Sequence, residues 1–223
     1  MMLPRVLCEP VRKRLSMYIL RAKVKAVDVS NETALFGLAG TGADAVVAQL
    51  ESVTSIRLPQ DRYLIAAPAT YASAIDFAGA AQRDGVLWEQ LDIEAGIPVI
   101  VPATQEQFVP QTVNLDLIGA VSFDKGCYPG QEIVARTHYL GRVKQRMVFA
   151  HLTSDTAPSP GDKLYSPSFD QSSGMIVNAV PALSGGYDAL AVVQTADVAS
   201  PEVRWKALDG PVLTLREPPY KLS

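Results

Sequence analysis

The sequence predicts an α+β protein in which a mixed region of helices and strands precedes an antiparallel β-domain. Up to residue 84, apolar residues recur first at helical and then at strand spacing. From Gly141 onward the apolar segments are short, and turns rich in Pro, Gly, Ser and Asp separate them. The length of 223 residues suits one large domain or two to three small ones.

Residues 1–84 are expected to form a partial ferredoxin-like α+β domain. Helical spacing of apolar residues predicts helices, and alternation of apolar with polar residues predicts strands. The expected order is a helix, two strands, a helix, a strand and a helix, over residues 10–22, 23–29, 33–39, 42–50, 62–67 and 69–83. A ferredoxin-like domain begins with a strand, so this order lacks the first one. We therefore expect the sequence to lack an N-terminal part.

The middle segment, residues 85–140, and the β-domain, residues 141–223, follow. In the middle segment we expect a helix over 86–95, an extended piece over 97–101, a short helix near 115–118 and a helix over 131–136. Five short strands are expected in the β-domain, over residues 142–152, 163–165, 175–180, 188–194 and 212–216. Such spacing is typical of a small β-barrel or β-sandwich.

Composition narrows the class of protein. With 48% hydrophobic and 19% charged residues the chain is ordinary for a globular protein, and no apolar run approaches the ~20 residues of a membrane span. Two cysteines and two histidines supply neither a disulfide framework nor a standard zinc site, so no metal is expected. The net charge of −3 argues against stable nucleic-acid binding.

The number of cysteines and the basic N-terminal residues indicate the subcellular location of the protein. Two cysteines without a disulfide framework favour a reducing compartment, and we expect a bacterial cytoplasmic protein. Residues 1–25 hold seven Lys or Arg against one Glu, which leaves a mitochondrial matrix location as the alternative. Serine enrichment and a clear presequence boundary are missing from this stretch.

The most informative motif is Lys125-Gly126-Cys127-Tyr128-Pro129-Gly130-Gln131-Glu132. Pro129 suits a first helical position, which would put Cys127 at or just before the N-cap of the following helix. Backbone N–H groups and the Lys125 ammonium would then favour thiolate, whereas Glu132 opposes it. The alternative is a buried Cys127 that acts as a small apolar residue in a capping loop.

Other polar residues give weaker signals. Glu94 is expected at a helix end, where Gly96 fits a C-terminal cap and a carboxylate is usually exposed and inert. Three basic residues alternate on one predicted strand, with Arg136 just upstream: Arg142, Lys144 and Arg146. They could bind an anionic ligand or form a solvated strand face. His138 and His151 have no nearby metal ligands in the sequence and are expected at the surface or in packing.

Several segments together resemble the YgfZ family, which belongs to the folate-binding aminomethyltransferase-like (GcvT) superfamily. They are the Lys125–Glu132 motif, Ile93–Pro98, Phe108–Gln111, Asn114-Leu115 and Ala135–Gly141. The resemblance runs from the Arg12–Val27 region nearly to Tyr220, so it covers most of the chain. It implies a GcvT-like multidomain fold with three domains around a central channel, in which residues 85–140 belong to the folate-binding domain.

The resemblance also implies a function. Members bind tetrahydrofolate and work in iron–sulfur cluster assembly or repair and, in bacteria, support tRNA methylthiolation. By this resemblance Cys127 is the functional thiol with Lys125 beside it, while Gly130, Gln131 and Glu132 shape the loop. Glu94 matches the glutamate that holds the pteridine ring, since a carboxylate can accept two parallel N–H bonds. Arg136 is a candidate for the glutamate tail of folate.

Two departures favour an accessory factor over an aminomethyltransferase. Relatives carry a further N-terminal stretch with folate-channel residues, and Asp92 stands where the enzymes place arginine. The expected partners are folate, iron–sulfur assembly factors and iron–sulfur enzymes such as tRNA methylthiotransferases, and we expect a monomer. Transfer of an aminomethyl or methyl group to tetrahydrofolate is one alternative. A folate-free docking scaffold is the other.

Overall fold

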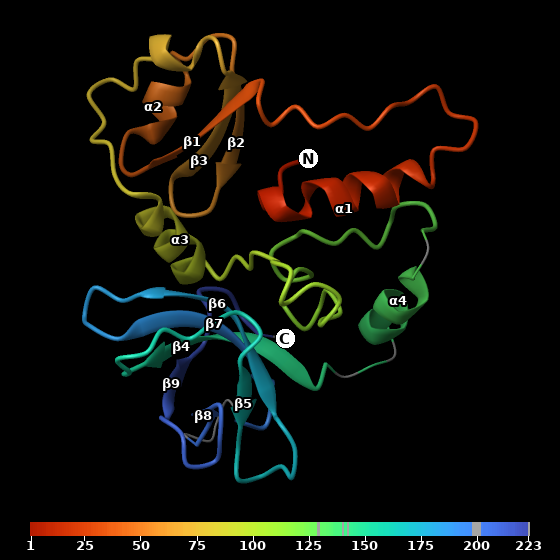
Figure 1. Cartoon of the computed structure of the whole chain (residues 1–223), viewed down its shortest axis with the longest axis vertical. Helices are drawn as coiled ribbons and strands as arrows, with labels where there is room; N and C mark the ends of the chain where they lie inside the picture. Colours follow the sequence, from red (N-terminus) through yellow and green to blue (C-terminus); the bar gives the residue numbers. More distant parts are fainter. Residues whose placement is uncertain (129, 140, 142, 198–201, 223) are drawn as a thin grey trace. The chain divides into compact units, whose positions relative to one another are not determined.

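The computed structural model describes residues 1–128, 130–139, 141, 143–197 and 202–222, in two compact units, Met1–Trp88 and Glu89–Ser223. Each unit holds one antiparallel sheet within the described residues (Figure 1). The strand order is β1-β3-β2 in the first unit and β8-β5-β6-β7-β4-β9 in the second. This mixture of helices and antiparallel sheets confirms the predicted α+β class.

The sheet of the first unit packs one face against a short helix. Its strands are β1 (Thr33–Ala39), β2 (Thr54–Leu58) and β3 (Arg62–Pro68), and the helix is α2 (Ala43–Val47). Because alternate strand residues point to the same face, Leu38 of β1 and Ile65 of β3 meet Ala43 of α2 in one apolar cluster. Phe36 adds a tilted ring contact with Phe77 at 5.2 Å between centroids.

Three predicted elements of the first unit are confirmed and others are wrong. Strands 33–39 and 62–67 lie where expected, and the helix predicted over 42–50 is found as the shorter α2, whereas β2 was not predicted. The predicted helix over 69–83 is reduced to the 3-10 turn η1 (Ala72–Ala74). Alanine content favoured a helix, but the Asp76 carboxylate accepts the Ala78 N–H at 2.8 Å, and Ala78 and Gly79 have left-handed φ angles of 53° and 76°. A local turn therefore replaces the helix.

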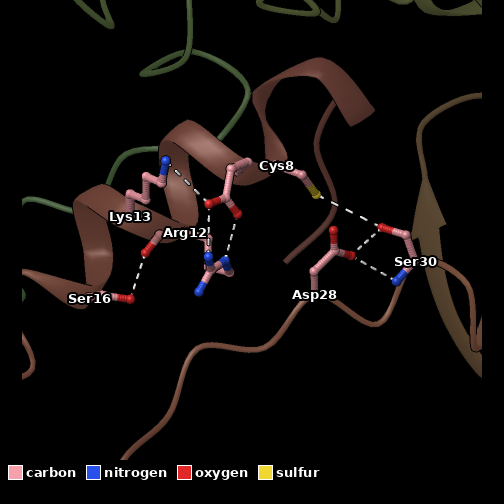
Figure 2. Close-up of polar contacts among 7 residues, drawn as sticks. Cys8, Arg12, Lys13, Ser16, Asp28 and Ser30 are labelled. Carbon is pink, nitrogen blue, oxygen red and sulfur yellow. Dashed lines mark hydrogen bonds and ion pairs between the residues drawn. The ribbon is translucent and has the colours of Figure 1, made fainter.

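The start of the chain also differs from expectation. The first helix, α1, spans Arg5–Ser16 instead of residues 10–22 and includes Pro10. No strand forms over residues 23–29, because the Asp28 carboxylate accepts both the backbone N–H and the hydroxyl of Ser30, at 2.9 and 2.5 Å. Figure 2 shows this turn facing Cys8, whose Sγ lies 3.9 Å from Ser30 Oγ. Both cysteines of the chain are free.

The sheet of the second unit buries both of its faces. Its strands are β4 (Gln145–Leu152), β5 (Lys163–Tyr165), β6 (Gly174–Pro181), β7 (Tyr187–Gln194), β8 (Arg204–Trp205) and β9 (Leu213–Arg216). Along β4, Met147 and Phe149 enter one apolar cluster while Val148 and Ala150 enter another. The edge strands approach each other where Leu213 N donates to Val203 O at 2.8 Å, beside a bridge between Arg204 and Val212. All five predicted strands are found, and only the two-residue β8 was not expected.

Two helices complete the described elements, α3 (Gly85–Glu94) and α4 (Gln131–Tyr139), close to the predicted ranges. Residues 97–101 form no strand, because the Asn178 side chain satisfies both backbone groups of Val99, at 2.9 and 2.8 Å. The predicted short helix at 115–118 is a series of turns. No helix in the described part of the chain is long and apolar enough to cross a membrane.

Candidate functional site

The Lys125–Glu132 motif is followed by α4 (green in Figure 1), and a buried side chain holds this helix in place. Val134 is the buried residue of α4, with 7% of its surface exposed. Gln111 donates from Nε2 to the Val134 carbonyl at 2.6 Å, and this bond is itself buried. A buried hydrogen bond from a different segment fixes both the position and the rotation of a nine-residue helix.

An ion pair ties the same Gln111 segment to strand β4. Arg146 Nη1 donates to the Gln111 carbonyl at 2.7 Å and to Asp116 Oδ1 at 2.9 Å, while Nη2 donates to Asp116 Oδ2 at 3.2 Å. The two side chains are 4% and 12% exposed. This bidentate geometry is the strong form of an arginine–carboxylate contact. The helix after the motif is thereby connected, through Gln111, to a central strand of the sheet.

The predicted basic strip on this strand is therefore wrong in part. Arg146 belongs to the interior, where Asp116 neutralises it, whereas Lys144 is exposed. Strand alternation could not reveal that Arg146 contacts Gln111 and Asp116 of a different segment. Arg142 lies outside the described residues.

Cys127 is exposed, which excludes the alternative of a buried capping-loop cysteine. It lies four residues before Gln131, the first residue of α4, so its predicted place at or just before the N-cap is wrong. The helix starts late because Gly130 has a left-handed φ of 85° and the Gln131 side chain accepts the Tyr128 N–H at 3.2 Å. Pro129, the predicted first helical residue, lies outside the described residues.

The remaining predicted residues of the motif surround this thiol along the chain. The Lys125 ammonium lies 5.1 Å from the centre of the Tyr128 ring, a cation–π contact that occupies both side chains. Glu132 and Arg136 are exposed on α4. Lys125, Gly130, Gln131, Glu132 and Arg136 thus lie with Cys127 on one loop and helix. Among the described residues no ion pair joins them to one another.

Glu94 ends helix α3 and is exposed, and the turn after it is held firmly. Gly96 takes a left-handed φ of 66°, as predicted for the C-terminal cap, and its carbonyl accepts the Tyr220 hydroxyl at 2.8 Å. Asn114 donates to the same hydroxyl at 3.2 Å and to the Met147 carbonyl at 2.7 Å. No hydrogen bond or ion pair joins Glu94 to the motif among the described residues.

Burial raises the pKa of Tyr220 above its ordinary value. The phenol therefore stays protonated and can donate to Gly96 throughout the neutral range. Sequence reasoning missed the roles of Gln111, Asp116 and Tyr220, and it expected Arg146 in a basic strip and not in the interior. Long-range side-chain contacts of this kind leave no periodic signal in the sequence.

The site can offer a solvent-exposed thiol on the loop that precedes the anchored helix α4. No group of three or more His, Cys, Asp or Glu side chains capable of holding a metal ion occurs among the described residues. The loop presents the Cys127 sulfur to solvent.

Comparison with known proteins identifies the family. The chain is 30% identical to the tRNA-modifying protein YgfZ of Enterobacter sp. (strain 638), over 94% of this chain and 70% of that protein. The chain belongs to the YgfZ family. It is also 29% identical to YgfZ of Yersinia enterocolitica, over 94% of this chain and 69% of the relative, and 31% identical to YgfZ of Yersinia pestis (strain Pestoides F) over 67% and 51%. No family model matches the sequence.

Membership in the YgfZ family confirms the resemblance drawn from the motif and its flanking segments. The roles expected for the residues of the motif stay predictions, and the helix that follows the motif begins later than expected.

Proposed function

We propose that this chain is a folate-binding accessory factor for iron–sulfur cluster assembly or repair, and that it supports iron–sulfur-dependent tRNA modification by methylthiolation through the Cys127 thiol. The observation that carries the proposal is the exposure of Cys127 within the Lys125–Glu132 motif, on a loop whose following helix is anchored by Gln111. YgfZ relatives named as tRNA-modifying proteins support the tRNA part of the proposal.

The exposed thiol suits work on a partner protein. An accessible cysteine can bind iron, form a transient adduct or scavenge an oxidant, and each of these roles requires solvent access. In this proposal the iron–sulfur cluster is cargo or substrate, so the chain needs to supply one sulfur and not a full ligand set. The anchored helix that follows lowers the entropic cost of ordering the loop when a partner binds.

Two exposed residues could bind folate, Glu94 at its pteridine ring and Arg136 at its glutamate tail. Glu94 is exposed and held at the end of α3 by the Gly96 turn, so its carboxylate is available to accept the N–H donors of a pteridine. Arg136 is exposed on α4 and would meet the carboxylates of the glutamate tail. When bound, the folate would supply a one-carbon carrier or a reductant close to the site.

The thiol is tested by replacing Cys127 with serine in cells that lack their own family member. Cys127→Ser is expected to fold normally, since the side chain is exposed, and to lose rescue of iron–sulfur enzyme activity. Cys8→Ser, which removes the other free cysteine, is the matched control and should rescue fully. Full rescue by Cys127→Ser would show that the Cys127 thiol is not required for this activity.

Folate binding is tested by titrating tetrahydrofolate while following fluorescence from Trp88 and Trp205. Glu94→Gln keeps the shape of the side chain but removes its charge, so we expect affinity to fall roughly tenfold. Glu89→Gln, an exposed neighbour on the same helix, should leave affinity unchanged. If tetrahydrofolate binds the wild type and Glu94→Gln with equal affinity, the pteridine does not contact Glu94. If tetrahydrofolate does not bind the wild type, the folate-free scaffold is favoured.

A further inference from the structure

The stretch of residues 14–29, which runs from the end of α1 toward β1, exposes an unusual number of large apolar side chains. Leu20 is 86% exposed and Met17 is 68% exposed. Single apolar residues on a surface are ordinary, whereas a concentration of them indicates a site of interaction. The exposed large apolar residues of the 14–29 segment are Leu15, Met17, Tyr18, Leu20, Val24, Val27 and Val29.

The same segment carries unpaired positive charge. Arg12 and Lys13, just before it, are both paired with Glu9, at 2.8 and 3.5 Å (Figure 2). Asp28 is the single carboxylate of the segment, and it accepts hydrogen bonds from its neighbour Ser30. The cations of the segment, none of which forms an ion pair with a residue that the structure describes, are Arg14, Arg21, Lys23 and Lys25.

A groove of about 690 Å³ adjoins the segment within the first unit. Its apolar walls include Val11 and Leu15 of α1, Val27 of the segment and Leu35 of β1. Three cations and one carboxylate also line it. Apolar walls with a surplus of positive charge suit the acyl chain of a lipid that has an anionic head group.

The exposed apolar side chains distinguish a lipid from an RNA partner, since phosphate groups of either would satisfy the cations. RNA is bound by cations and by stacked aromatic rings, and an aliphatic side chain such as Leu20 gains little from a sugar–phosphate backbone. At a membrane, aliphatic side chains enter the boundary between head groups and acyl chains, while Lys and Arg contact anionic head groups. Two copies of this chain joined through the segment would bring like charges together, which opposes self-association.

The acidic charge of the rest of the chain does not prevent contact with an anionic surface. The whole chain has a net charge of −3 although the 14–29 segment is basic. Salt screens exposed charges from one another beyond about 8 Å at physiological ionic strength. A membrane therefore responds mainly to the charges of the segment that touches it.

We propose that residues 14–29 dock this protein on the surface of a membrane that contains anionic lipids. Leu20 and the other exposed apolar side chains enter the head-group boundary, and the groove receives an acyl chain. Arg14, Arg21, Lys23 and Lys25 contact the lipid phosphates. Because few cations take part, the association is peripheral and sensitive to salt.

The test is sedimentation of the whole chain with vesicles of equal parts phosphatidylglycerol and phosphatidylcholine. We expect the chain to sediment with these vesicles. Binding should be at least about tenfold weaker with vesicles of phosphatidylcholine alone, and high salt should weaken binding to the anionic vesicles to a similar extent.

Charge is tested by a double variant within the segment. Lys23→Gln with Lys25→Gln should weaken binding to the anionic vesicles about tenfold, because two contacts with head groups are lost. Lys163→Gln with Lys221→Gln removes the same charge at exposed lysines of the second unit and should leave binding unchanged.

The apolar contribution is tested by Leu20→Ser. Loss of its burial in the head-group boundary should weaken vesicle binding about tenfold. Leu183 of the second unit is 90% exposed, so Leu183→Ser is the matched control and should bind like the wild type.

Absence of sedimentation with the anionic vesicles would overturn the proposal, and so would equal binding by Leu20→Ser and Leu183→Ser. Binding of an oligouridylate by a chain that does not bind vesicles would assign the cations to RNA instead. Cys127→Ser, in the second unit, should bind vesicles like the wild type. Loss of the thiol's role would therefore leave the docking segment standing, and failure of vesicle binding would leave the proposed function standing.

Discussion

At the scale of single residues, Tyr220 connects segments that are far apart in the sequence. Its hydroxyl donates to Gly96 after α3 and accepts from Asn114, which in turn bonds to β4. A side chain on Gly96 would collide with the Tyr220 ring, so the glycine serves both the left-handed turn and this close approach. The turn that carries Glu94 is thereby fixed by the C-terminal tail.

Removing this hydroxyl should destabilise the protein measurably. Tyr220→Phe loses two hydrogen bonds in a half-buried position, and we expect the free energy of unfolding to fall by about 1–2 kcal/mol in chemical denaturation. Tyr139→Phe, at an exposed tyrosine, should change it by less than about 0.5 kcal/mol.

The same variant has a pH signature. The folded pKa of Tyr220 is raised by burial, so its contribution to stability is fully present below the unfolded value of about 10 and is lost as pH rises through the folded value. Tyr220→Phe should therefore show a shallower alkaline loss of stability than the wild type. Identical slopes in the two proteins would show that the phenol is not buried as described.

Prediction from sequence at this scale was uneven. The Lys125–Glu132 motif indicated Cys127 directly, because a rare residue among glycines and charges is recognisable without a structure. Arg146 was not recognised as a buried residue, because its partner Asp116 lies 30 positions earlier. Alternation along a strand reports which face a residue occupies and not what covers that face.

At the scale of elements, α4 depends on contacts from outside itself. It has nine residues, which is too short to be stable alone in water, and only Val134 is buried. Its position comes from Gln111, whose carbonyl accepts a hydrogen bond from Arg146, and Arg146 is in turn paired with Asp116. The site is therefore anchored to β4 by polar contacts more than by apolar packing.

Breaking the ion pair should loosen the helix. Asp116→Ala takes the carboxylate away from a buried guanidinium, and we expect a loss of about 3 kcal/mol in the free energy of unfolding. In the Asp116→Ala variant, hydrogen exchange of the α4 backbone amides should speed up relative to the wild type, and it should speed up more than exchange in β6 and β7. Asp155→Ala, at an exposed aspartate, is the control. Unchanged exchange in α4 would mean that Gln111 holds the helix without help from Arg146.

Elements with strong periodicity were the ones that sequence could predict. The strands of the second unit were found near their expected places, since apolar residues on both faces of their sheet enter buried clusters. Helix α3 also lies near its expected place. The helix over 69–83 and the strand over 23–29 were wrong because single aspartates, Asp76 and Asp28, redirect the backbone through local hydrogen bonds. Predictions based on alanine content or on alternation of apolar residues do not take such side-chain hydrogen bonds into account.

At the scale of the whole molecule, family membership and the exposed thiol point in the same direction. The chain belongs to the YgfZ family. Its Lys125–Glu132 motif leads into an anchored helix, and Cys127 in this motif is open to solvent. Sequence reasoning reached the motif and the family, whereas the contacts that anchor the motif required the structure. The central claim is that this thiol supports tRNA methylthiolation.

The most direct test measures the methylthiolated nucleoside in tRNA, by mass spectrometry, from cells that lack their own family member and express this chain. The wild type and Cys8→Ser should restore the modification equally, and Cys127→Ser, present at the same level, should not. Restoration by Cys127→Ser to the level of the wild type would contradict the account.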